Sequence, residues 1–313
     1  MALWSLAVCL VLVQDPPTLE SLESDKMAVA SSSGFFADPG PIQKINEGVL
    51  TLVSLDKLKT GEDFSRASRL YSVLNWDFED AREKYELTLV AFSLGDKLAA
   101  TKLTFEWDTL QFSSGRPQRF GSMKLPAGFE SNLFAVKMSP SSVVSTLGDQ
   151  GAAIKAAASY ANNKLLQDTV DADQKEREGN WMDHTEQEFI DIGKRDRQRF
   201  KTAKDCIEKR RAHTAQDFYN AALVLQHGEV ADDFALAHEL SLCSIVLGDN
   251  SNARWLAAAS YDRMLRHLGH RQRFATQYNS SGLDREDETG TNDTMRKALN
   301  CPSLEEARKR IIK

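Results

Sequence analysis

Residues 214–277 are TAQDFYNAALVLQHGEVADDFALAHELSLCSIVLGDNSNARWLAAASYDRMLRHLGHRQRFATQ, the stretch with the most regular helical periodicity in the chain. Its apolar side chains recur at the i, i+3, i+4 and i+7 spacing of an amphipathic helix in three successive runs. Thr214 and Asp217 have the spacing of an N-terminal helix cap. A glycine ends each run, at Gly228, Gly248 and Gly269. The stretch therefore predicts three consecutive helices.

A second stretch, residues 58–123, aligns with residues 212–277 nearly end to end once single-residue slips are allowed in the connections. Both stretches contain helix caps, apolar positions, helix-ending glycines and a G-x-x-Q-R-F tail, at residues 115–120 and 269–274. Two unrelated amphipathic helices would share the apolar period but not this ordered set of glycines and tail residues. The sequence therefore predicts an internal duplication.

The second copy carries polar side chains that the first copy lacks. The first copy has Val73-Leu74 near the position of Gln226-His227, Tyr85 for His238, Thr109 for Arg263, and Ser122-Met123 for Thr276-Gln277. A copy that keeps its packing positions and loses polar groups is expected to serve as a platform. A functional site is therefore expected in the second copy.

The chain has 313 residues, of which 42% are hydrophobic and 27% are charged, as in soluble proteins that bury a sizeable core. The periodicity predicts a mainly α-helical fold of two related three-helix units joined by additional helices. The additional helices are expected at residues 152–168, at 185–211 and after the Ser303-x-x-Glu306 capping box. The expected organisation is a candidate signal peptide at 1–14, a linker at 15–45, a degenerate first copy at 46–124, a connecting segment at 125–159 and the second copy, with the site, at 160–313.

Residues 2–13, ALWSLAVCLVLV, form an apolar run that is too short to span a bilayer but has the length of a signal-peptide core. No Lys or Arg precedes the run, and the nearest A-x-A pattern, residues 28–30, lies well downstream. The first expectation is export to the periplasm or the extracellular space, with no transmembrane span after signal removal. The alternatives are a membrane anchor at the N-terminus and a buried N-terminal segment.

The net charge of -6 argues against a nucleic-acid partner, because phosphate binding depends on clustered Lys and Arg. A protein or a small polar ligand is the kind of partner that remains. Cys206, Cys243 and Cys301 lack the spacing of a metal site and predict no disulfide framework. The chain has no metalloprotease, phosphate-loop or dinucleotide fingerprint, so the sequence identifies no cofactor.

Asp262 falls on the apolar face of the third predicted helix, where a carboxylate is costly unless it is paired. His238 on the second helix is one possible partner, and Arg273 or Gln277 in the tail is another. The structural alternative is that Asp262 ties the tail to its helix. This alternative is favoured because Asp108 and Arg119 keep the same pattern in the first copy.

Gln226-His227 stands at the C-terminal turn of its helix, where a histidine can simply cap free carbonyl groups. Against this, His227, His238 and Asp262 are ligand-type residues on three successive helices. Such a set could hold a metal ion or form a general base with an orienting carboxylate. Capping and catalysis therefore both stay open for His227.

The runs DFYNAALVLQHG, ARWLAAASYDRML and GHRQRFATQ resemble an uncharacterised bacterial family, a domain of unknown function with a Gln-His pair and a Gly-x-x-Q-x-(Tyr/Phe)-Gly-Thr-Gln ending. Asp173-Gln174-x-x-Arg177 and Cys301-Pro302-Ser303-Leu304-Glu305 resemble the edges of that domain, so the likeness covers about residues 168–308. Ala275 stands where the family pattern has Gly. The family has no established activity, so the resemblance implies a domain boundary and a site location only.

The leading hypothesis is an exported, non-enzymatic binding or interaction module. Its expected ligand-binding residues lie in the second copy and are Gln226, His227, His238, Arg263, Gln272, Thr276 and Gln277. The alternative is a hydrolase-like enzyme, with or without a metal ion, that uses His227, His238 and Asp262. A sensor of a small polar ligand is a third hypothesis.

Overall fold

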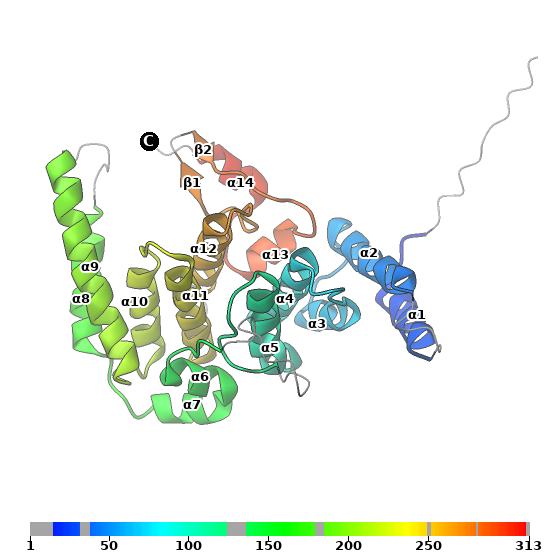
Figure 1. Ribbon diagram of the computed structural model, residues 1–313, viewed down its shortest axis with the longest axis horizontal. Coiled ribbons are helices and arrows are strands. Elements are labelled where there is room, and N and C mark those ends of the chain that lie inside the picture. The colour runs from blue at the N-terminus through cyan, green and yellow to red at the C-terminus, as the bar shows by residue number, and fades with distance from the viewer. Residues whose placement is uncertain are drawn as a thin grey trace, which may run out of the picture.

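The computed structural model describes residues 15–31, 38–123, 136–178, 185–248, 252–279 and 281–310. These residues form fourteen helices and one two-stranded antiparallel sheet, so the predicted mainly α-helical fold is confirmed (Figure 1). None of the helices in these ranges combines the length and the hydropathy needed to cross a membrane. The candidate signal peptide at residues 1–14 lies outside the described residues.

Each predicted three-helix unit is present. The first unit consists of α3 (Gly61–Leu70), α4 (Phe78–Ser93) and α5 (Lys97–Ser113). The second unit consists of α10 (Ala215–Leu225), α11 (Ala231–Val246) and α12 (Asn252–His267). Within each unit the middle helix packs against the helices before and after it. The caps are the predicted ones, because Thr60 and Thr214 each form a capping box with the Asp three residues later.

The two units lie side by side and share one hydrophobic core that extends from α1 to the residues after α13 (Figure 1). Four rings meet where the units touch: Tyr85 of α4, Trp107 of α5, His238 of α11 and Tyr261 of α12. All four are at most 1% exposed. Because the rings come from both units, neither unit buries its apolar face alone.

The N-terminal segment is helical, which corrects the predicted linker at residues 15–45. It contains α1 (Leu19–Ser31) and the start of α2 (Gly40–Ser54), whose first turn accommodates Pro41. The local pattern of α1 is weak because it buries only Leu19 and Leu22. Polar contacts hold it instead: Lys26 donates to the carbonyl groups of Arg69 and Leu70 at the end of α3.

In the described part of residues 114–214, four helices separate the units. The predicted connecting segment at 125–159 contains α6 (Ser141–Gly148) and α7 (Gln150–Ala157). The helix expected at 152–168 is interrupted, because Asn163 caps a new helix, α8 (Lys164–Glu176). The charged helix expected at 185–211 is confirmed as α9 (Glu186–Glu208). Helices α8 and α9 pack against each other and form a hairpin at one end of the molecule (Figure 1).

The C-terminal part folds over the ends of both units. Strands β1 (Tyr278–Asn279) and β2 (Gly282–Leu283) pair next to α12, and α13 (Asp293–Ala298) contacts α4 of the first unit. The last helix is α14 (Leu304–Lys309), and it begins with the predicted Ser303–Glu306 capping box.

Candidate functional site

Asp262 organises the tail that follows α12. Its carboxylate accepts hydrogen bonds from the backbone N–H groups of Arg273 (2.7 Å), Phe274 and Thr276, and from the hydroxyl group of Thr276 (2.7 Å). The carboxylate is fully buried, and burial raises its pKa despite these bonds. The contacts agree with the structural alternative, in which Asp262 ties the tail to its helix.

Asp108 has the same partners in the first unit. It accepts from the backbone N–H groups of Arg119 (2.6 Å) and Phe120, and from both the N–H (2.8 Å) and the hydroxyl group (2.7 Å) of Ser122. The tail of each unit is therefore held by a buried aspartate on the preceding helix. A feature present in both units belongs to the scaffold.

Gln272 and Thr276 also belong to this scaffold. The side chain of Gln272 accepts from the N–H of Gln277 (2.8 Å), as the side chain of Gln118 accepts from the N–H of Met123 (3.0 Å) in the first unit. The side-chain NH₂ group of Gln272 also donates to the carbonyl oxygen of Gln277, and that of Gln118 donates to the carbonyl oxygen of Met123. These bonds close the tail into a loop, which leaves neither Gln272 nor Thr276 free for a ligand.

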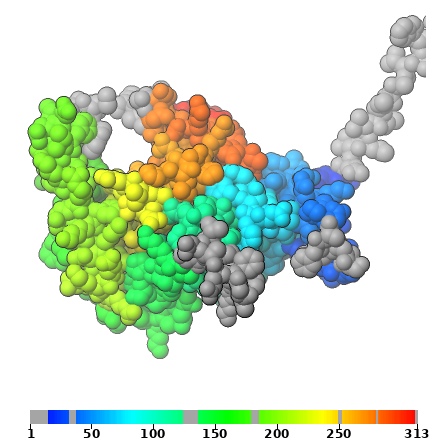
Figure 2. Space-filling model, in the orientation of Figure 1, coloured from blue at the N-terminus to red at the C-terminus, as the bar shows by residue number. Residues whose placement is uncertain are grey.

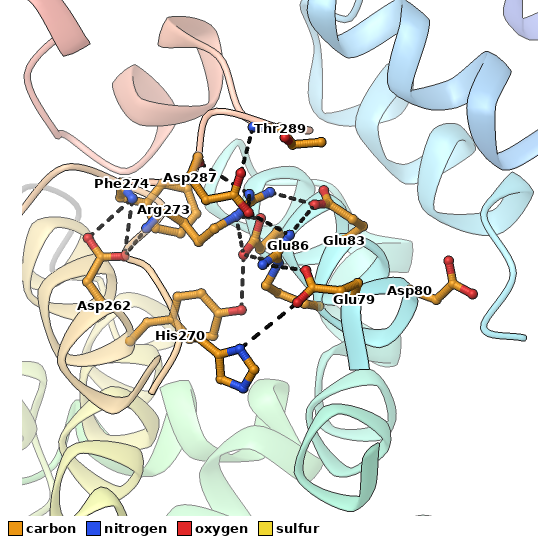
Figure 3. Close-up of polar contacts among 12 residues, drawn as sticks. Glu79, Asp80, Glu83, Glu86, Asp262, His270, Arg273, Phe274, Asp287 and Thr289 are labelled. Atoms are coloured by element: carbon orange, nitrogen blue, oxygen red, sulfur yellow. Dashed lines mark hydrogen bonds and ion pairs between the residues drawn. The ribbon is translucent and has the colours of Figure 1, made fainter. Parts of the chain in front are cut away.

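The tails also join the two units through buried ion pairs. Arg273 of the second unit contacts Glu86 of α4 at 2.9 Å and Glu83 at 2.7 Å (Figure 3). Arg119 of the first unit contacts Glu239 of α11 at 2.7 Å. Each tail arginine therefore pairs with a glutamate on the middle helix of the other unit.

His238 lies at the contact between the units. Its Nε2 bonds to the hydroxyl group of Tyr85, and its Nδ1 lies 2.8 Å from the carbonyl oxygen of Ala257. Burial lowers the pKa of His238 to about 4, so the ring is neutral at pH 7. A neutral ring that donates from Nδ1 and accepts at Nε2 satisfies both contacts. His238 is therefore a satisfied core residue.

The three-residue centre expected from His227, His238 and Asp262 is not formed. Across the described ranges, no three His, Cys, Asp or Glu side chains are grouped so that they could hold a metal ion. His238 and Asp262 have the separate partners given above. This corrects the idea that three ligand-type residues on successive helices converge.

Four of the predicted binding residues do lie together, at the end of α10. Arg263 donates from Nε to the side-chain oxygen of Gln277 (2.9 Å) and from Nη1 to the carbonyl oxygen of Gln226. His227 follows Gln226 directly. The amide of Gln277 also donates to the carbonyl oxygen of Ala259 (3.2 Å). The side chain of Arg263 thus links α12 to the C-terminus of α10.

Asp173 of α8 and Arg177, the residue directly after α8, complete this group. Asp173 Oδ2 lies 3.7 Å from His227 Nε2, and Arg177 donates to Asp173 Oδ1 at 2.6 Å. Burial and the neighbouring Arg177 and Arg263 lower the pKa of His227 to about 3. His227 is therefore neutral, and its contact with Asp173 is not an ion pair. In the sequence, Asp173 and Arg177 are marked only by their similarity to the edge of the family pattern.

His227 and Gly228 line two adjoining cavities, which we call the His227 cleft. One cavity, of about 260 Å³, lies between α9 and the ends of α10 and α11 and includes Asp173, Phe200 and Asp233. The other, of about 500 Å³, runs along α12 to the tail, and its further lining residues are Phe234, Arg263, Arg266, His267, Gln277 and Tyr278. Figure 2 shows the surface hollowed between the green α8–α9 hairpin and the yellow and orange residues of the second unit.

Comparisons with protein-family models, with curated proteins and with solved structures found no match to this chain. The candidate site therefore depends on the geometry of its own residues.

Proposed function

We propose that this protein is a non-enzymatic binding module and that its ligand occupies the His227 cleft. The observation that carries the proposal is the imidazole of His227. Its Nε2 atom is buried without a hydrogen-bond partner in the described part of the chain, and the residue lines both cavities. A buried polar atom without a partner costs about 1–3 kcal/mol, and a ligand that draws the imidazole toward the cleft and bonds to Nε2 offsets this cost.

The first unit supports the proposal by contrast. Val73-Leu74 stand near the position of Gln226-His227, so the first unit has no imidazole there. Thr109, the counterpart of Arg263, instead donates its hydroxyl group to the carbonyl oxygen of Phe105 (2.9 Å), and the sulfur of Met123 lies 3.7 Å away. The polar group around His227 is therefore not needed to fold a unit of this kind, which favours a role in binding.

Binding is better supported than catalysis. A histidine with a pKa of about 3 is a poor general base at neutral pH, because the best catalytic pKa lies near the working pH. Among the described residues that line the two cavities there is no Ser, Thr or Cys that could serve as a nucleophile. The cleft offers hydrogen-bonding and charged groups that can hold a ligand.

NMR on protein with isotope-labelled histidine tests the proposal. We expect some members of a panel of amino acids, sugars, carboxylates and nucleotides to shift the imidazole signals of His227. We expect His227→Leu, which copies Leu74 of the first unit, to weaken their binding at least about tenfold. His213→Leu, at the stacking contact with Tyr160 beside another cavity, is the matched control and should bind normally. The proposal fails if no panel member moves the His227 signals, or if those that do bind His227→Leu equally well.

We also propose that the two units descend from one three-helix ancestor and that the protein is exported. The shared tail contacts of Asp108 and Asp262 support the first proposal, and the apolar run at residues 2–13 supports the second. Fractionation of cells that make the full chain with a C-terminal tag tests export. Retention of the unprocessed chain in the cytoplasm would contradict it.

A further inference from the structure

The cavity beside α12 is built around the guanidinium group of Arg263. Two of its three nitrogens donate to neutral oxygens, the side chain of Gln277 and the carbonyl of Gln226. Nη2 makes no hydrogen bond within the described residues, and it is not among the fully buried atoms that lack a partner. Since Arg263 lines the cavity, Nη2 is the donor that is accessible from it.

The charge of Arg263 is not balanced by an acidic side chain. Arg273, Arg119 and Arg177 each contact a carboxylate at 2.6–2.9 Å, whereas no described Asp or Glu forms an ion pair with Arg263. Burial, Arg266 and Arg177 lower the pKa of Arg263 to about 10, so the group is still a cation at pH 7. A partly buried cation without a counter-ion is unfavourable.

The protein compensates for this charge only in part. The carbonyl of Gln226 belongs to the C-terminus of α10, where the helix dipole favours a positive charge. The cavity itself adds no negative charge, since its described lining includes Arg266 and His267 but neither Asp nor Glu. Arg266 is already paired with Asp284. One positive charge, that of Arg263, is therefore left for a ligand.

The other residues that line the cavity indicate the chemistry of the ligand, both its charged group and the part attached to that group. Phe234 and Tyr278 are aromatic residues of the same cavity, and the Gln277 side chain lies beside Arg263. One unpaired guanidinium matches a singly charged carboxylate better than a doubly charged phosphate. The aromatic side chains match an apolar body next to that carboxylate.

We infer that the cavity of the His227 cleft that runs along α12 binds a small organic carboxylate, whose carboxylate group contacts Arg263 and whose apolar part packs on Phe234 and Tyr278. This inference rests on the proposed binding function of the cleft.

Four probes at constant ionic strength test the inference on the full chain: phenylacetate, acetate, inorganic phosphate and the neutral analogue phenylacetamide. Binding is followed by the imidazole signals of His227 and by calorimetry. We expect phenylacetate to bind most tightly, acetate more weakly, and phenylacetamide at least about tenfold more weakly than phenylacetate. Arg263→Thr combined with Gln277→Met copies the Thr109 and Met123 pair of the first unit and should lose at least about tenfold in phenylacetate affinity.

Two further variants exclude trivial explanations. Arg308→Gln, which removes an exposed arginine paired with Glu286 and Glu288, should bind phenylacetate as the unmodified protein does. Arg263→Lys keeps the charge without the planar fork and should keep part of the affinity. A thermal melt of each variant verifies that it is folded.

The possible failures point to different causes. Tighter binding of phosphate than of phenylacetate overturns the assignment to a carboxylate. Equal binding of phenylacetamide and phenylacetate, or undiminished binding by the Arg263→Thr, Gln277→Met variant, overturns the role of Arg263 while the cleft remains a binding site. If none of the four probes binds, the inference is wrong. The proposed function fails with it only if the wider panel also leaves the His227 signals unmoved.

Discussion

The two three-helix units have the same frame and different chemistry at one pair of positions. In both units an aspartate on the third helix and a glutamine in the tail hold the tail as a loop, Asp108 with Gln118 and Asp262 with Gln272. The pair at the mouth of the loop is a hydroxyl and a thioether in the first unit, Thr109 with Met123. In the second unit it is Arg263 with Gln277. A contact that is weakly polar in one unit is charged in the other.

A difference between the units does not by itself mark a functional residue. Tyr85 and His238 occupy corresponding positions and differ in type, yet they bond to each other at the contact between the units. His238 uses one ring nitrogen for Tyr85 and the other for the carbonyl oxygen of Ala257, whereas a tyrosine offers a single hydroxyl group. Tyr85 and His238 therefore differ in type because they bond to each other, and the difference does not mark a binding residue. Only differences that face a cavity, such as His227 and Arg263, indicate a site.

The strongest test of the comparison concerns the tail arginines. Arg273→Met removes the guanidinium that pairs with Glu83, Glu86 and Asp287, and we expect a loss of about 3–5 kcal/mol in the free energy of unfolding although Arg82 and Tyr261 keep their contacts with the glutamates. Arg119→Met should cost less, because it leaves one glutamate, Glu239, which keeps hydrogen bonds from Trp107 (3.0 Å) and Ser139 (2.7 Å). Urea denaturation of both variants measures the difference. Equal losses would show that the two pairs are equivalent despite these extra donors.

The Arg273→Met loss should depend on pH. Burial raises the pKa of Glu86 to about 7 even beside Arg273, and removal of the arginine raises it further. The folded variant then binds more protons than the unfolded chain between pH 4.5 and the raised pKa, so its stability falls as pH rises through that window. We expect a larger deficit relative to the unmodified protein at pH 8 than at pH 5. A deficit that is constant with pH would contradict the buried position of Glu86.

A second, smaller effect is expected from the tail aspartates. Asp108→Ala and Asp262→Ala each remove the acceptor of three backbone N–H groups, and each should lower the free energy of unfolding by about 2–4 kcal/mol. The two losses should be similar, because the contacts are the same. Thermal and urea denaturation measure them. A folded Asp262→Ala variant of normal stability that loses ligand binding would instead make Asp262 a site residue.

The sequence predicted those parts of the fold that depend on local pattern. Helices α9 to α12 and the role of Asp262 followed from apolar spacing, caps and the repetition of Asp108. Helix α1 was missed because its support comes from Lys26, which bonds to carbonyl groups more than forty residues away. A local sequence pattern does not indicate a contact between residues that are so far apart in the chain.

The grouping of the candidate residues was predicted in part for the same reason. Gln226, His227, Arg263 and Gln277 lie on adjacent elements of one unit and lie together as the sequence indicated, whereas their role in binding stays a prediction. Asp173 approaches His227 from α8, and in the sequence it stands only at the edge of the region that resembles the family. His238 was misplaced because its partner, Tyr85, is 153 residues earlier, and nothing local indicates that the units face each other there.

The smallest expected effect concerns the turn within each tail. Gly121 and Ala275 occupy corresponding positions with φ of +62° and +58°, a conformation that favours glycine. A Cβ atom at Gly121 would lie 3.6 Å from the Val136 side chain, an ordinary contact, so Gly121→Ala should cost the backbone term of about 1–2 kcal/mol, reduced by about 0.4–1 kcal/mol of unfolded-chain entropy.

The reverse change should not give the opposite result. Ala275→Gly relieves the backbone but removes a fully buried methyl group, worth about 0.8 kcal/mol, and adds about 0.4–1 kcal/mol of unfolded-chain entropy. The terms nearly cancel, so we expect a change within about 0.5 kcal/mol by urea denaturation. Equal and opposite effects of the two variants would mean that the Ala275 methyl group contributes no packing. The positive φ of Ala275 would then be backbone strain without any gain in packing. A loop that binds a ligand can retain such strain, whereas a turn that only supports the fold is expected to have glycine there.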